Sequence, residues 1–190
     1  MTIQELFIES NKALAKTVSQ IHADQWSLDM PAGTSRRPMM LDAAVRYHTY
    51  DDAWVPDVLA GKTKEEVGEQ YEGLLKAGDI QANYEKHFQR ANEAVAKFDD
   101  LDRVTHLSYG DFPARDFLQH IISFRAFPAY DIAKLIGADT TMDPELVAAL
   151  DAEFRPVIES YRKMGVFPPA VDVGPDAGPQ AKLLAMVGRS

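Results

Sequence analysis

The chain has 190 residues, no cysteine, and 29 acidic against 20 basic side chains, which gives a formal net charge of −9. A negative balance of this size repels phosphate backbones and anionic lipids, so we expect neither nucleic acid nor a membrane as a partner. The lack of cysteine excludes disulfides, thiolate nucleophiles, iron–sulfur clusters and cysteine-ligated zinc. The length predicts a single domain over residues 1–190. The first residues show no basic segment followed by an apolar run, so we expect a cytoplasmic protein.

Apolar residues recur at three- and four-residue steps along most of the chain, which indicates amphipathic helices. Pro38 stands where the first turn of the second helix tolerates proline. Asp143 and Pro144 are typical of a helix start, since aspartate caps the end and proline suits the first position. The predicted helices cover residues 3–21, 40–60, 80–98, 113–136 and 143–163.

The predicted connections are a loop over residues 23–37, a short helix or ordered connection over 62–76, and an extended tail over 166–180. Residues 104–109 have a strand-like composition but are too short and isolated to predict a sheet. Residues 181–187 are expected to form a small apolar turn. Because each apolar stripe must be buried against another, the sequence predicts an all-α four-helix bundle with additional short helices and an extended C-terminal tail.

Two of the five histidines lie on the apolar stripes of predicted helices, and imidazole is the commonest metal ligand as well as an acid–base group near neutrality. His48 lies three residues after Val45, and helical geometry turns it towards the interior. His87 faces inward by the same spacing. Each is interpreted either as a buried imidazole bonded to a neighbouring group or as a functional residue. His22 and His106 lie in connections and are expected to be solvated.

The predicted helix over 113–136 contains Pro128 in its interior. Proline removes one backbone donor and crowds the carbonyl of Phe124, which costs about 3 kcal/mol unless the helix bends or restarts there. The sequence leaves open whether Pro128 kinks or splits this helix.

Three segments make the chain resemble the DinB-like family of metal-binding four-helix bundles, near the branch of the mycothiol-dependent maleylpyruvate isomerases. They are Leu41–His48, Ala129–Gly137 and Pro179–Arg189. The resemblance spans most of the chain, and the last segment is fairly specific to that branch.

The resemblance implies a divalent metal held by a histidine of the second helix and by an acid or histidine pair, four residues apart, on a later helix. An aspartate follows the last histidine by three residues. His48 matches the first ligand and Asp131 matches the trailing aspartate, as a ligand or as a group that supports one. The two positions of the pair hold Phe124 and Pro128, which cannot bind a metal through their side chains. His120 lies one turn before Phe124.

Two functions therefore stay open, and no catalytic residue is assigned. The first is a DinB-like bundle with a degenerate metal site and no cofactor, which has a non-catalytic role or binds a small apolar ligand. The second is a thiol transferase or isomerase of the mycothiol type, which uses zinc or nickel. Its ligands are His48 and a relocated His120, with Asp131, Asp51 or Asp52. In the alternative orientation, His120 faces another helix or solvent.

Aromatic residues around His48 favour a pocket for the small ligand of the first function, although such a stripe is also typical of ordinary packing. Bundles of this size commonly self-associate, so a homodimer is a further expectation. The predicted pocket is lined by Tyr47, Tyr50, Trp54, Phe124, Phe127 and Pro128.

Overall fold

The computed structural model describes residues 1–34 and 37–190. These residues form two compact units, Met1–Thr140 and Thr141–Ser190. Helices are the main regular structure of both units, which confirms the expectation of a helical protein. The four-helix bundle itself stays a prediction. The prediction of one domain over residues 1–190 stays a prediction. Among the described helices, none is both long enough and apolar enough to cross a membrane.

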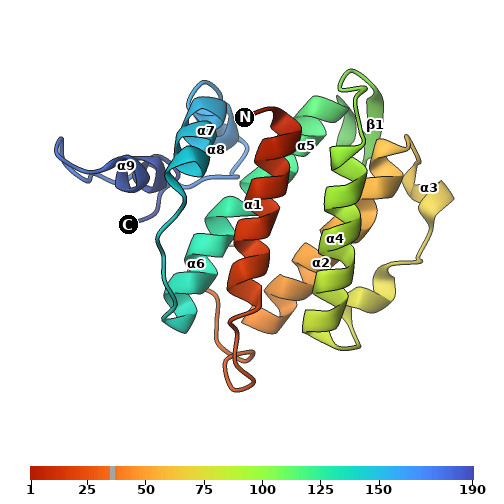
Figure 1. Ribbon diagram of the computed structural model, residues 1–190, viewed down its shortest axis with the longest axis horizontal. Coiled ribbons are helices and arrows are strands. Elements are labelled where there is room, and N and C mark those ends of the chain that lie inside the picture. The colour runs from red at the N-terminus through yellow and green to blue at the C-terminus, as the bar shows by residue number, and fades with distance from the viewer. Residues whose placement is uncertain (35–36) are drawn as a thin grey trace. The chain divides into compact units, whose positions relative to one another are not determined.

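The first unit is built from helices that pack around α1 (Figure 1). Helix α1 contacts α4, α5 and α6, while α2 packs against α4. The elements of this unit are α1 (Ile3–Val18), α2 (Leu41–Leu59), α3 (Lys64–Val67), a 3-10 turn η1 (Glu72–Leu75), α4 (Ile80–Ala96), β1 (Val104–Leu107), β2 (Gly110–Pro113), α5 (Ala114–Ser123) and α6 (Ala126–Ile136).

The ends of the first helices follow local chemistry. Thr2 and Glu5 form a reciprocal capping box at the start of α1. The start of α2 differs from the prediction, because the helix begins at Leu41 with Met40 in extended conformation, so Pro38 lies before the helix. The predicted ordered connection over 62–76 contains α3 and η1. Positions 35–36 of the predicted loop lie outside the described residues.

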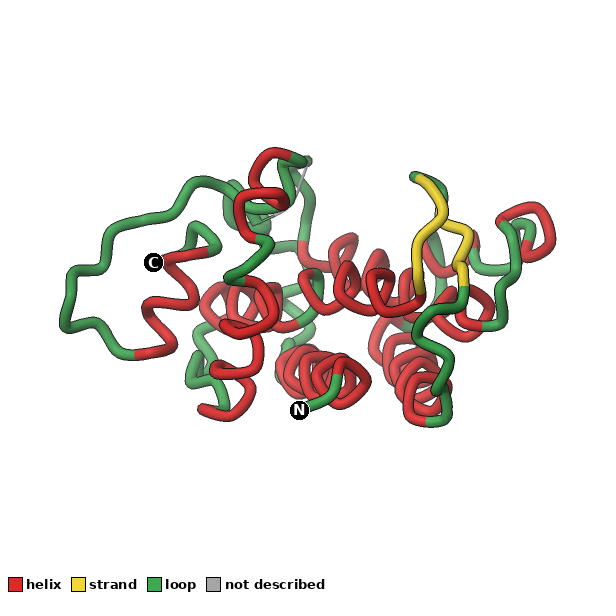
Figure 2. Tube along the Cα trace, turned by 90° about the horizontal axis from the view of Figure 1, so that it is seen from above, coloured by secondary structure: helices red, strands yellow, loops and turns green. Residues whose placement is uncertain are grey.

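The structure contains a β-hairpin where no sheet was expected (Figure 2). Strands β1 and β2 pair antiparallel, with Val104 opposite Pro113 and Leu107 opposite Gly110. Gly110 has a φ of +136°, a conformation open to glycine, which allows the tight connection. The prediction was wrong because it evaluated residues 104–109 alone and missed their partner strand.

The predicted helix over 113–136 is two helices, α5 and α6, which answers the question left open by Pro128. Helix α5 ends at Ser123 and α6 starts at Ala126, so Pro128 is the third residue of α6. The first-turn amides of a helix have no partner within it, and proline is therefore tolerated there. The break leaves Arg125 between the two helices.

The second unit contains α7 (Pro144–Phe154), α8 (Ile158–Lys163) and α9 (Pro179–Met186). The Asp143 side chain accepts from the amides of Glu145 and Leu146, which confirms the predicted cap. The single helix predicted over 143–163 is interrupted, because Pro156 has no amide hydrogen to continue it. The predicted apolar turn is helix α9, which packs against α7.

Candidate functional site

The break between α5 and α6 places Arg125 inside the first unit, with none of its side chain exposed. Its Nε and Nη2 donate to Asp52 Oδ1 at 3.2 and 2.9 Å. Its Nη1 donates to the Phe124 carbonyl at 3.0 Å and to His48 Nδ1 at 3.2 Å, and Nη2 also reaches the His48 carbonyl at 3.4 Å. These contacts occupy all the N–H directions of a guanidinium, so Arg125 joins α2 to the α5–α6 break with no donor left over.

Asp52 is the buried counter-ion of this arginine and is also fully enclosed. Its Oδ1 accepts a further hydrogen bond from Asn11 Nδ2 of α1 at 3.4 Å, and the same amide donates to Asn92 of α4 at 3.2 Å. Pro56 has no amide hydrogen, so the main-chain carbonyl of Asp52, one turn earlier, lacks its usual helical donor.

These hydrogen bonds form a cluster that connects α1, α2, α4 and the α5–α6 break. Its members are Arg125, Asp52, His48, Asn11 and Asn92.

His48 is partly buried and takes part in this cluster as a neutral acceptor. A guanidinium has only donors, so Nδ1 must accept, and Nε2 of the neutral ring then carries the proton. Burial and, to a smaller extent, the Arg125 charge together lower the pKa of His48 to about 3. The expectation that His48 faces inward is met by its contact with the buried Arg125.

Burial and neighbouring charges act in opposite directions on the pKa values of the cluster's charged groups. Burial opposes the charge on Arg125, but Asp52 and Asp51 raise its pKa. The outer carboxylate, Asp51, lies 3.9 Å from Arg125 Nη1 and keeps 38% of its side chain exposed. The pKa of Asp51 is raised to about 6, because burial and, to a smaller extent, the Asp52 charge raise it more than the Arg125 charge lowers it. Because Asp51 meets solvent, water tempers the effect of burial.

Two of the predicted pocket residues are exposed rings beside this cluster. Tyr47 is 46% exposed and Phe124 is 37% exposed. Tyr47 precedes His48, and Phe124 precedes Arg125, so the rings flank the contact between those two side chains in sequence. They are the only two of the six predicted lining residues that are classed as exposed.

The other predicted pocket residues are placed elsewhere. Phe127 and Pro128 are buried in α6. Tyr50 and Trp54 pack with Tyr71 instead, in a row of tilted and edge-on rings that ends at His87. His87 is buried, as predicted, and burial lowers its pKa.

The remaining predicted ligands are not gathered around His48. His120 lies on α5 against the hairpin, with Nδ1 3.2 Å from the Tyr109 hydroxyl and its ring edge-on to Phe112. Asp131 is buried on α6. In the described ranges 1–34 and 37–190, no three histidine, aspartate or glutamate side chains are grouped so that they could hold a metal ion. His48, His120 and Asp131 thus do not form such a group.

Sequence reasoning missed Arg125, although a signal was present. The apolar stripe over residues 118–132 repeats at alternating steps of four and three residues, and Arg125 occupies the one step that is not apolar. The apolar positions of this stripe are Leu118, Ile122, Ala129 and Ile132. Asp52 interrupts the stripe of α2 in the same way, between His48 and Val55. Oppositely charged residues at the buried positions of two facing helices are a signature of an internal ion pair.

The predicted solvated histidines also have definite places. His22 is exposed, and His106 on β1 is partly exposed, with Nδ1 2.9 Å from Asp111 Oδ1.

Comparisons of the chain with protein-family models, curated proteins and solved structures found no match.

Proposed function

We propose that this protein is a DinB-like four-helix bundle whose internal metal site is degenerate, and that it binds a small apolar ligand without metal catalysis. The observation that supports this most is the hydrogen bond from Arg125 to His48 Nδ1. In this proposal a fixed guanidinium supplies, beside His48, the positive charge that a divalent ion supplies in the family that the chain resembles.

The donor set around His48 does not suit a metal ion. A metal needs a free lone pair on a neutral imidazole, but Nδ1 is engaged by Arg125 and Nε2 carries the proton. The guanidinium would also repel a divalent cation at this distance. Asp52, the buried carboxylate one helical turn after His48, already accepts two bonds from Arg125.

The ligand is proposed to lie on the exposed rings of Tyr47 and Phe124. Exposed aromatic rings offer apolar contact, and burying one against a ligand is worth more than burying most other side chains. Asp51 lies one helical turn after Tyr47, keeps 38% of its side chain exposed and provides a polar edge. This proposal narrows the predicted pocket to two residues, because the Tyr50 ring already packs against Trp54 and the Trp54 ring against Tyr71.

The first experiment tests the metal. Elemental analysis of protein purified without a histidine tag or chelator, followed by calorimetric titration with Zn²⁺ and Ni²⁺, should give no stoichiometric binding. His48→Ala should behave in the same way. One ion per wild-type chain that is lost in His48→Ala would overturn the proposal in favour of the metal-dependent thiol transferase or isomerase.

The second experiment tests the ligand surface with 8-anilinonaphthalene-1-sulfonate as the probe. We expect its fluorescence to rise on binding the native chain, and Tyr47→Ser and Phe124→Ser to weaken binding several-fold. Tyr109→Ser is the matched control, since Tyr109 is an exposed ring on the hairpin connection. Equal affinity for all four proteins would refute a ligand site at Tyr47 and Phe124.

A further inference from the structure

The segment between α2 and α4 buries few of its own side chains. Residues 62–77, here called the strap, contain α3 and η1 and follow the edge of the first unit, in yellow around α3 in Figure 1. Within the strap, only Val67 and Tyr71 are buried. A segment with so few buried apolar side chains belongs to the parts of a fold that open at low free-energy cost.

The two buried residues of the strap cover side chains of α2 and α4. Val67 and Tyr71 pack with Ala53 of α2, which is 0% exposed. The Tyr71 ring also lies edge-on to Trp54 of α2, at 5.9 Å between ring centroids, and to His87 of α4, at 6.0 Å. Moving Tyr71 away would therefore uncover Ala53 and the facing edges of both rings.

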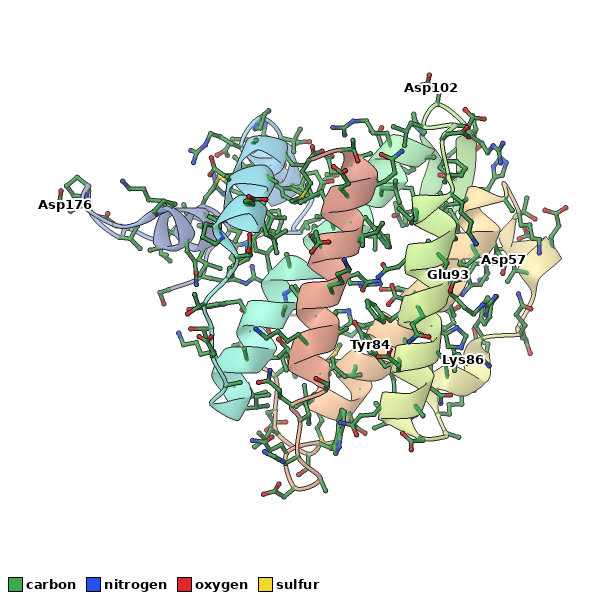
Figure 3. All side chains as sticks on the ribbon, viewed as in Figure 1. Asp57, Tyr84, Lys86, Glu93, Asp102 and Asp176 are labelled. Carbon is green, nitrogen blue, oxygen red and sulfur yellow. The ribbon has the colours of Figure 1, made fainter. Side chains whose placement is uncertain are left out.

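Asp57, near the end of α2, binds the strap through three side chains. Its Oδ2 accepts from the Tyr71 hydroxyl at 2.7 Å and from Gln70 Nε2 at 3.1 Å. Its Oδ1 pairs with Lys62 Nζ at 2.7 Å. Figure 3 labels Asp57 on the side of the unit where α3 lies. One carboxylate thus holds both the start of the strap and the residue that covers Ala53.

Arg46, also on α2, binds the other end of the strap through main-chain oxygens. Its Nη1 donates to the carbonyls of Leu74 and Ala77 at 3.4 and 2.9 Å, and its Nη2 donates to the Gly78 carbonyl at 3.3 Å. Gly61 and Gly78 flank the strap with φ of +79° and +87°. Because glycine changes backbone conformation at low cost, both ends of the strap can pivot.

The closed position of the strap leaves one buried atom unsatisfied. His87 is 5% exposed, and its Nδ1 has no hydrogen-bond partner within the described ranges 1–34 and 37–190. An unsatisfied buried polar atom costs about 1–3 kcal/mol. Water can reach the imidazole once Tyr71 withdraws, so opening removes this penalty and offsets part of the contacts that it breaks.

We propose that the strap opens as one body about its flanking glycines while α2 and α4 stay folded, and that Asp57 and Arg46 keep it closed. Opening withdraws Tyr71 and uncovers Ala53 and His87. The hydrogen bonds of the two anchor residues set how often this happens, since they join the strap to a helix that does not move. The motion is independent of the apolar ligand proposed above.

Thiol labelling of the full chain tests the motion, because the sequence has no cysteine and one introduced thiol is therefore the sole reporter. Ala53→Cys places the thiol beneath the strap. Ala44→Cys is the matched reference on the same helix, since Ala44 packs in a different cluster, with Leu14 and Tyr84, and is 5% exposed. In native buffer with dithionitrobenzoate, Ala53→Cys should react at least about ten times faster than Ala44→Cys. Equal rates would overturn the proposal, because both thiols would then react only through unfolding of the whole unit.

Asp57→Ala and Arg46→Met, each combined with either thiol, test the anchors. Both substitutions should speed the labelling of Ala53→Cys several-fold and leave that of Ala44→Cys unchanged. Asp42→Ala is the matched control, since Asp42 lies at the start of α2 and accepts from an amide of its own helix, and it should change neither rate. An equal rise at both thiols would show that the anchor variants weaken the whole unit, and it would overturn the proposal, as would no rise at either thiol.

Discussion

Two helices of this protein are interrupted near a proline, yet the interruptions have opposite consequences. At the α5–α6 break, Arg125 is fully buried and bonded to Asp52 of α2. At the α7–α8 break, Arg155 keeps 60% of its side chain exposed and pairs with Asp151, one turn earlier on its own helix. Both interruptions follow from the local sequence, but only the first places a charged side chain in the interior of its unit. The arginine at the first break therefore makes a tertiary contact with another helix, whereas the arginine at the second break pairs within its own helix.

The largest expected difference lies between Arg125→Met and Arg155→Met. Removing Arg125 leaves Asp52 buried without a counter-ion, which we expect to cost about 3–5 kcal/mol of unfolding free energy. Removing Arg155 breaks an exposed pair worth at most about 1 kcal/mol. Urea unfolding followed by circular dichroism measures both. Similar small losses in the two variants would show that the Arg125 cluster contributes nothing special.

The dependence of stability on pH provides a second contrast, because His48 and Asp51 act in opposite directions. The folded pKa of His48, about 3, is below its ordinary value of 6.5. The unfolded chain therefore binds the proton first, and stability is lost as pH falls from about 6.5 towards 3. The folded pKa of Asp51, about 6, is above its ordinary value of 3.8. Its contribution is present below about pH 3.8 and is lost as pH rises through 6.

Single variants separate the two contributions. In urea unfolding between pH 4 and 7, His48→Gln should lose the decline on the acid side, and Asp51→Asn should make that decline steeper than in the wild type. Identical profiles for the wild type and both variants would contradict the assignment of both shifts.

The smallest effects are expected for the prolines themselves. Pro128→Ala should change the unfolding free energy by less than about 1 kcal/mol, because the amide that it restores lies in the first turn of α6, where amides lack helical partners. The α5–α6 break should persist, since the Arg125 contacts hold it. Pro156→Ala should instead join α7 to α8 and raise the helical ellipticity at 222 nm. A larger gain for Pro128→Ala would mean that proline alone maintains the first break.

Much of the fold follows from local pattern, and the errors lie where a contact distant in sequence decides. The cap at Asp143 and the helix over 80–98 were predictable, because capping and apolar spacing act within one helix. The hairpin was missed because strand β1 is stabilised by a partner, as when Thr105 Oγ1 donates to the Phe112 carbonyl at 2.8 Å. The break before Pro128 was foreseen as one alternative, whereas the break at Pro156 was not.

The sequence by itself determined where most of the long helices lie and that His48 and His87 point inward. Only the tertiary structure decided that Arg125 is buried against Asp52 and His48, and that His120 lies against the hairpin. The physical reason is that helical periodicity fixes the face a residue occupies, but not the residue that it meets there. An arginine on an apolar stripe has no stable place until another helix brings a carboxylate to the same depth.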